Sequence, residues 1–106
     1  MSFSNLEMKV IRWAEDRGII KYSTSLAQTH KTQEELDELV GALTSGDEAA
    51  TKDAYGDILV TQIVGCACAN YRLVDCLELA YNQIKDREGR LLSNGIFVKE
   101  EDANDQ

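Results

Sequence analysis

The chain has no proline and few aromatic residues. Aromatic side chains make up 7% of its 106 residues, and no position carries a proline. Long helices therefore meet no residue that would break them, and apolar residues recur with a helical period through most of the chain. We expect an all-α fold in a single domain spanning residues 1–106.

Histidine and paired cysteines are also scarce. His30 is the single histidine, and Cys66, Cys68 and Cys76 form neither a CxxC pair nor a set with histidines at zinc spacing. This argues against a zinc site, and against a di-iron bundle, which needs two Glu-x-x-His motifs. Cys66 and Cys68 lie in an apolar run and are interpreted as small buried side chains, so no disulfide is expected.

Clusters of basic residues and very long apolar stretches are missing too. The formal net charge is -8, whereas proteins that grip nucleic acid need clustered lysine and arginine. The first residues lack the pattern of a signal peptide, and no apolar run approaches the ~20 residues of a membrane span. We expect a cytoplasmic protein with neither a polynucleotide nor a membrane as partner.

Four helical segments are predicted, followed by a small hairpin. The helices are expected at residues 5–16, from 23–25 to 43, from 47 to 71, and from 73 or 74 to 86. Arg17-Gly18, Ser45-Gly46 and Gly89 are expected to end the first, second and fourth helices, and Asp47 is expected to cap the start of the third. Asn94-Gly95 between short apolar groups predicts the turn of the hairpin. Residues 100–106 are a polar tail that is expected to fray.

The apolar residues of these helices predict how they pack. In the second helix, apolar residues recur at a spacing of three and four: Leu36, Leu39, Val40 and Leu43. The fourth helix is expected to bury one apolar side, made by Leu77, Leu79, Ala80 and Ile84. The third helix is apolar on nearly every side from Ile58 to Ala69, and its small residues 65–69 would let another helix approach closely. A four-helix, bundle-like domain completed by oligomerisation, as a homodimer or homotetramer, is therefore expected.

The second helix carries three glutamates in an EExxE pattern. Glu34 and Glu38 are i,i+4 neighbours, and Glu35 and Glu38 are i,i+3 neighbours, so their carboxylates can converge. Like charges placed in this way repel one another unless water or a cation lies between them. Taken alone, such a pattern is most often a solvated acidic face.

A second acidic pair lies on the third helix. Asp53 and Asp57 are i,i+4 neighbours, and Asp57 directly precedes the apolar run, so it is expected to be half-buried. Two antiparallel helices would bring both acidic sets to one end of a bundle, where crowded carboxylates need a cation. Mg²⁺ prefers oxygen ligands and combines a few carboxylates with substrate phosphates, so we expect one or two Mg²⁺ ions, with Mn²⁺ as a substitute.

The ordered set of segments resembles a known family. VIRWAEDRGI (10–19), EELDEL (34–39), KDAYGDILV (52–60) and CLELAYNQIKDREGRLLSNGIFVKE (76–100), together with Gln28 and Lys31, resemble MazG-like nucleotide pyrophosphohydrolases, particularly the short phage and bacterial members. The resemblance covers roughly residues 7 to 100. It implies an all-α oligomer that uses Mg²⁺ to split a nucleoside triphosphate into the monophosphate and pyrophosphate, with water attacking the α-phosphorus.

The resemblance also implies roles for individual residues. Glu34, Glu35 and Glu38 would be catalytic metal ligands, one of which also orients or deprotonates the attacking water, and Asp57 matches the aspartate of the family's second motif. That motif commonly reads ExxD, but Ala54 stands at its first position here. Asp53 is the available acid, displaced by about 100° around the helix, so it is either a direct ligand or bound through water.

Lys31, Asn82 and Lys85 resemble the residues that reach the sugar and phosphates of the nucleotide. Two roles stay open from the residues alone. Lys85 can instead complement the dipole at a helix end, and Trp13 can either stack on a base or belong to a core or interface.

Two alternatives to this function remain at the level of sequence. One is a non-catalytic helical interaction module, in which the acids are solvated and the apolar third helix is an assembly surface. The other keeps the fold but hydrolyses a different nucleotide phosphoanhydride, such as that of a deoxynucleoside diphosphate. The preferred base and sugar do not follow from the sequence.

Overall fold

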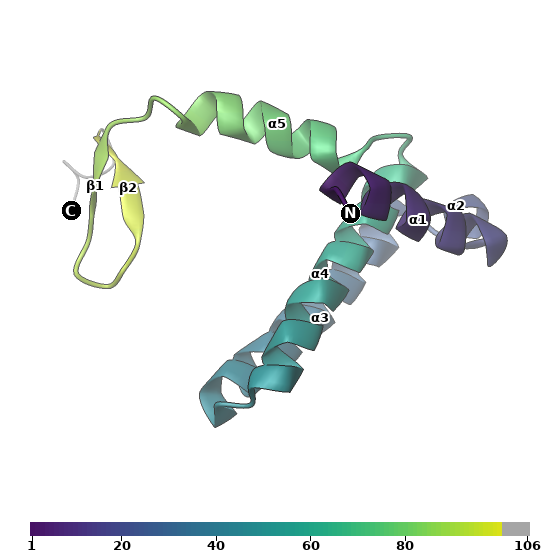
Figure 1. Ribbon diagram of the computed structural model, residues 1–106, viewed down its shortest axis with the longest axis horizontal. Coiled ribbons are helices and arrows are strands. Elements are labelled where there is room, and N and C mark those ends of the chain that lie inside the picture. Colours follow the sequence, from purple (N-terminus) through teal and green to yellow (C-terminus); the bar gives the residue numbers. More distant parts are fainter. Residues whose placement is uncertain (101–106) are drawn as a thin grey trace. The chain divides into compact units, whose positions relative to one another are not determined.

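The computed structural model describes residues 1–100 of the chain, and most of them are helical (Figure 1). The all-α character and the C-terminal hairpin are confirmed, while residues 101–106 of the expected polar tail lie outside the described residues. The elements are α1 (Phe3–Asp16), α2 (Ile19–Tyr22), α3 (Ser25–Ser45), α4 (Glu48–Cys68), α5 (Leu73–Ile84), β1 (Gly89–Leu91) and β2 (Phe97–Lys99).

Helix ends follow the local signals of the sequence closely. The Asp47 side chain accepts a hydrogen bond from the Ala50 N–H at 3.0 Å and caps α4 as predicted. Gly18 and Gly46 end α1 and α3 in the left-handed region, at φ 75° and 72°. Asn70 also has a positive φ, of 64°, so α4 ends at Cys68, three residues earlier than predicted. The segment Ile19–Tyr22, expected to lead into a turn, forms the single helical turn α2.

The chain divides into two compact units, residues 1–76 and the part from Leu77 onward. In the first unit, α3 and α4 are joined by a short turn and lie antiparallel along their whole length (Figure 1). Helices α1 and α2 pack against α4. The antiparallel pair of α3 and α4 is therefore the frame of this unit.

The close approach of α3 and α4 depends on Gly65. A Cβ atom at this position would lie 3.3 Å from Cβ of Gln28, and the Ser25 hydroxyl donates a hydrogen bond of 2.6 Å to the Gly65 carbonyl. The small residues here were expected to let another helix approach closely. At Gly65 the helix that approaches is α3 of the same chain.

The core of the first unit is small. Helix α3 buries Leu39 and Ala42, but Leu36, Val40 and Leu43 are 45%, 62% and 53% exposed. Only part of the predicted apolar repeat of this helix is therefore buried within the described chain. The reason is that α3 packs along α4 alone among the described elements, and one neighbour covers one stripe.

A partly buried ion pair joins α1 to the start of α5. Glu7 is fully buried, and its carboxylate accepts hydrogen bonds from Arg72 Nε at 2.9 Å and Nη2 at 2.6 Å. Its second oxygen accepts from the Val74 N–H at 3.1 Å. The carboxylate is thus fully paired, and it fixes α1 against the turn between α4 and α5.

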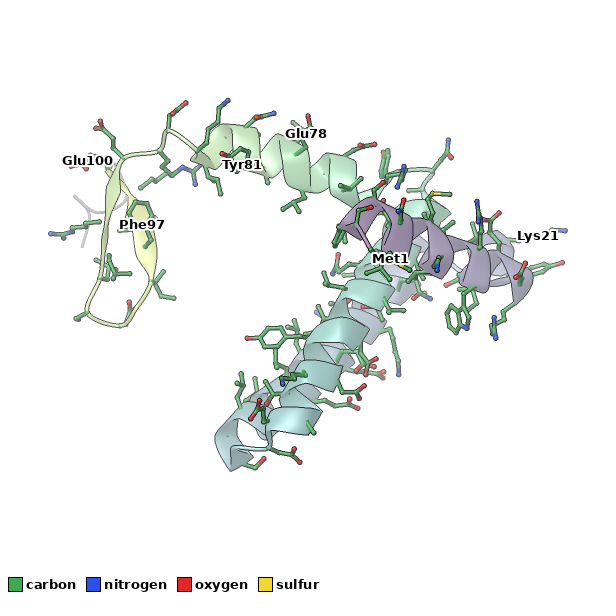
Figure 2. The ribbon with its side chains drawn as sticks, viewed as in Figure 1. Met1, Lys21, Glu78, Tyr81, Phe97 and Glu100 are labelled. Atoms are coloured by element: carbon green, nitrogen blue, oxygen red, sulfur yellow. The ribbon has the colours of Figure 1, made fainter. Side chains whose placement is uncertain are left out.

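The second unit holds most of α5 and the hairpin. Leu91 pairs with Phe97, and Gly95 lies in the turn at φ 87°. Gly89 begins β1 rather than closing the helix, which ends at Ile84. The predicted apolar side of α5, Leu77, Leu79, Ala80 and Ile84, is exposed rather than buried, because the hairpin of the same unit does not cover it. Tyr81 and Phe97, labelled in Figure 2, are exposed as well.

No helix within residues 1–100 combines the length and the apolar character that crossing a bilayer requires.

Candidate metal centre

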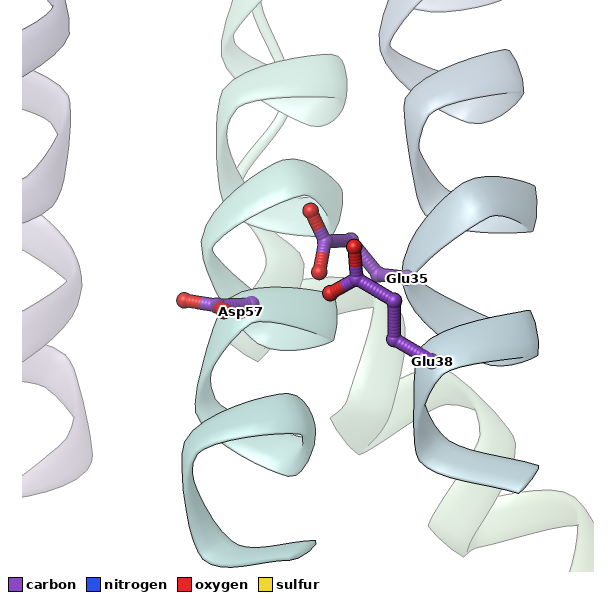
Figure 3. Close-up of side chains that lie close together, drawn as sticks. All are labelled: Glu35, Glu38 and Asp57. Carbon is purple, nitrogen blue, oxygen red and sulfur yellow. The ribbon is translucent and has the colours of Figure 1, made fainter. Parts of the chain in front are cut away.

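Glu35 and Glu38 of α3 and Asp57 of α4 form one cluster of carboxylates, which we call the acidic cluster. Each offers an oxygen, and the three oxygens lie within 4.8 Å of one another. In Figure 3, Glu35 and Glu38 extend from α3 towards α4, which carries Asp57. The structure thus brings two acids of the α3 set together with one acid of the α4 set, and the sequence predicted that the two sets would meet.

The position of the acidic cluster differs from the prediction. It lies midway along α3 and α4 and not at one end of a bundle. The two helices have the same length of 21 residues, and residues 35 and 57 lie about equally far from the turn between them. Residues in mid-helix are held by neighbours on both sides, so this site is more rigid than one at a frayed end.

Glu35 is the buried member of the cluster. Its exposed fraction is 8%, and its Oε2 atom is buried with no hydrogen-bond partner among the described residues. Burial raises the pKa of Glu35. A hydrogen bond with Glu38 and the negative charges of Glu38 and Asp57 raise this pKa further, while the positive charge of Lys31 lowers it. A buried carboxylate oxygen without a donor is costly, so a cation or a proton next to this atom would be favourable.

Asp57 is half-buried, as the sequence predicted. Burial raises the pKa of Asp57, the charges of Asp53 and Glu38 raise it further, and so does a hydrogen bond with Asp53. Asp53 itself is exposed and contacts the acidic cluster through Asp57 without belonging to the three-carboxylate group. Ala54, where the family commonly has glutamate, is 4% exposed and packs in the core.

Lys31 and Glu34 lie at the edge of the cluster. The Lys31 Nζ atom is 3.0 Å from Glu34 Oε2 and 3.9 Å from Glu35 Oε1. The Glu34 side chain is 67% exposed, and Glu38 is exposed as well, so Glu35 is the one buried glutamate of the EExxE pattern. Glu34 therefore pairs with the lysine and does not join the three-carboxylate group.

A pocket of about 520 Å³ opens beside Glu35 and Asp57. This volume lies in the range of small-molecule sites. Its charged lining is Lys31, Glu35 and Asp57, and the remaining lining residues are Trp13, Ile19, Ala27, Gln28, Val60, Thr61 and Val64. The pocket thus combines a polar, acidic wall with an apolar one.

Trp13 forms part of the apolar wall. Its exposed fraction is 44%, so it is not a core residue, and the guanidinium of Arg17 lies 4.7 Å from the centre of its ring. Of the two interpretations left open by the sequence, stacking on a ligand fits an exposed ring that lines a pocket, while burial in this chain's own core does not.

Two buried threonines fix α3 against α4 next to the acids. The hydroxyls of Thr32 and Thr61 are 2.7 Å apart, and Gln62 donates to Thr32 at 3.3 Å. Thr32 lies about one turn before Glu35, and Thr61 about one turn after Asp57, so this bond sets the register that makes the acids face each other. Sequence reasoning missed this contact, although a threonine inside an apolar run was its signal.

Asn82 and Lys85 belong to the second unit, and both are exposed. Their contact with a substrate stays a prediction.

Comparison with protein-family models, with curated proteins and with solved structures finds no match for this chain.

Proposed function

We propose that the chain is a Mg²⁺-dependent nucleotide pyrophosphohydrolase, which converts a nucleoside triphosphate and water into the monophosphate and pyrophosphate. One observation carries this proposal. The carboxylate of Glu35 is buried, one of its oxygens has no partner within residues 1–100, and it faces two further carboxylates at the edge of a pocket. Such an arrangement is costly when empty and favourable with a cation, as expected of a functional site.

The residues present fit a hard divalent metal. Glu35, Glu38 and Asp57 offer carboxylate oxygens, which suit Mg²⁺ and Mn²⁺, while the site has no thiolate or imidazole ligand among the described residues. These three residues would hold the metal, with Glu34 and Asp53 beside them. When bound, Mg²⁺ would neutralise the charge of the triphosphate and stabilise the charge that develops during its cleavage.

The chain's own residues supply binding and proton transfer. Lys31 binds phosphate oxygens as the basic side chain lining the described pocket, and Trp13 stacks on the base. A glutamate of the EExxE motif orients the attacking water and accepts its proton. The sequence resemblance alone assigns contacts with the sugar and phosphates to Asn82 and Lys85.

We further propose that the enzyme is a cytoplasmic homodimer or homotetramer. The exposed residues Leu36, Val40 and Leu43 follow one another at i, i+4 and i+7 and form an apolar stripe on α3. Leu59 adds exposed apolar surface on α4. A second copy that covers these residues would complete a four-helix arrangement. Sedimentation should show an oligomer at micromolar concentration, and a stable, folded monomer would contradict this.

The exposed stripe also supports the second candidate, a helical interaction module without catalysis. An interaction module of this kind would show no metal-dependent turnover of nucleotides. The two candidates therefore differ in a direct assay of turnover.

The deciding experiment measures pyrophosphate release from the common ribo- and deoxynucleoside triphosphates. We expect release with Mg²⁺ or Mn²⁺, loss of release with a chelator, and no restoration by Zn²⁺. Release of orthophosphate in place of pyrophosphate, or turnover of nucleoside diphosphates alone, would identify another phosphoanhydride as the substrate. Turnover that survives chelation, or no turnover of any nucleotide, would refute the proposed mechanism.

A further inference from the structure

Lys31 is the one basic side chain among the described residues that line the pocket. It contacts two carboxylates at once, Glu34 at 3.0 Å and Glu35 at 3.9 Å. The Lys31 side chain is 55% exposed, whereas that of Glu35 is 10% exposed. A long, flexible cation therefore rests against a fixed, buried anion.

The groups that face Lys31 from both helices are acidic. Helix α3 contributes Glu34, Glu35 and Glu38, all of which attract the lysine. Helix α4 contributes Asp57, which lies close enough to be influenced by the charge of Lys31. The ammonium group thus partly neutralises the acidic cluster, in the place where the proposed function needs a divalent cation.

A divalent cation at the acidic cluster and the ammonium of Lys31 repel each other. Glu35 is held inside the α3–α4 contact, while Lys31 has four rotatable bonds and a solvent-exposed end, so the lysine is the group that moves. An ammonium group that moves from the carboxylates into water forms no new ion pair. Released next to a phosphate group in the pocket, it gains a new ion pair.

We propose that Lys31 is an exchangeable counter-ion, paired with Glu34 and Glu35 in the metal-free site and transferred to substrate phosphate when the metal binds. This inference rests on the proposed metal site and adds its regulation. Metal and phosphate ligand then bind cooperatively, and by linkage each raises the affinity of the other by the same factor. The enzyme alone holds Mg²⁺ weakly and takes it up together with the nucleotide.

The test compares Lys31→Met with the control Lys52→Met. Lys52 forms an exposed i,i+4 pair with Glu48 at 3.0 Å, so the control also removes one ion-paired lysine, but from outside the acidic cluster. Calorimetry measures the affinity for Mg²⁺ alone and in the presence of pyrophosphate, with the binding of Mg²⁺ to free pyrophosphate measured separately. Because Lys31 is exposed, its replacement is not expected to prevent folding.

We expect Lys31→Met to bind Mg²⁺ alone about five- to tenfold more tightly than the unmodified protein, since the competing cation is gone. Pyrophosphate should raise the Mg²⁺ affinity of the unmodified protein and of Lys52→Met by roughly fivefold or more, and that of Lys31→Met much less. An unmodified protein that binds no Mg²⁺ under either condition refutes the metal site and with it the proposed function. If it binds Mg²⁺ but Lys31→Met shows an equal or lower affinity, or an undiminished effect of pyrophosphate, only the role of Lys31 is refuted.

Discussion

Replacing Glu35 by glutamine should lower activity and leave the metal-free protein as stable as before or more stable. The amide keeps the shape of the side chain but removes its charge. In the structure this charge is buried, lies near Glu38 and Asp57, and has one cationic neighbour, Lys31 at 3.9 Å. The substitution therefore removes two repulsive pairs and one attractive pair, together with the cost of burying a charge.

The attractive pair that is lost is weak, because more than half of the Lys31 side chain is exposed. The glutamine amide can also donate a hydrogen bond to the Glu38 carboxylate. The balance favours the variant, and we expect its melting temperature to equal that of the unmodified protein or to exceed it by about 2–5 °C in the absence of metal. Pyrophosphate release should fall by about a hundredfold or more, as when a group that stabilises transition-state charge is removed.

The measurements are thermal unfolding in a chelator and pyrophosphate release with saturating Mg²⁺. The control is Glu48→Gln, since Glu48 lies in the first turn of α4 with its side chain 82% exposed. It should keep its activity. A Glu35→Gln protein that is markedly less stable without metal would show that Glu35 is a structural anion, and one with near-normal activity would remove it from the site.

Three further predictions concern the same pair of helices. The pKa values of Glu35 and Asp57 in the folded protein are raised above their ordinary 4.5 and 3.8, so protonation of these carboxylates favours the folded state. This stabilisation is fully present below the ordinary pKa values and is lost as the pH rises through the raised pKa values of the folded protein. The melting temperature of the metal-free protein should accordingly fall with rising pH more than that of the double variant Glu35→Gln, Asp57→Asn, and an identical pH profile would be contrary to this. Asp53→Asn should reduce pyrophosphate release less than Asp57→Asn, because Asp53 reaches the acidic cluster through Asp57; equal losses would make it a direct ligand. Thr61→Val should lower the free energy of unfolding by about 1–3 kcal/mol in urea denaturation, because it removes the buried partner of Thr32, whereas Thr61→Ser should be close to the unmodified protein.

The helical character of the chain and the limits of its helices were readable from local signals. Gly18, Gly46 and the cap at Asp47 act within one turn of the backbone, so their effect does not depend on the rest of the fold. The hairpin at Asn94-Gly95 is local in the same sense. Two helices end earlier than the sequence pattern indicated: α4 ends at Cys68, before Asn70 with its positive φ, and α5 ends at Ile84. The short helix α2 was not predicted at all.

The acidic residues of the candidate site were also readable from the sequence, because their helical spacing places each set on one face. Which of them meet was not. Glu35 and Asp57 face each other because Thr32 bonds Thr61 and because Gly65 lets the helices approach, two contacts between residues far apart in the chain.

Burial was decided by the tertiary structure alone. The apolar spacing of α3 is the same for Leu36, Leu39 and Leu43, yet Leu39 alone of the three is buried. A sequence pattern shows which faces of a helix are apolar, but a face is buried only where another element lies against it. The same rule separates Glu34 from Glu35: they are adjacent in the sequence, and only the one that points into the contact with α4 loses its water. The sequence by itself therefore determined the helices and the acids, and the packing of α3 on α4 decided which acid became a buried carboxylate in need of a cation.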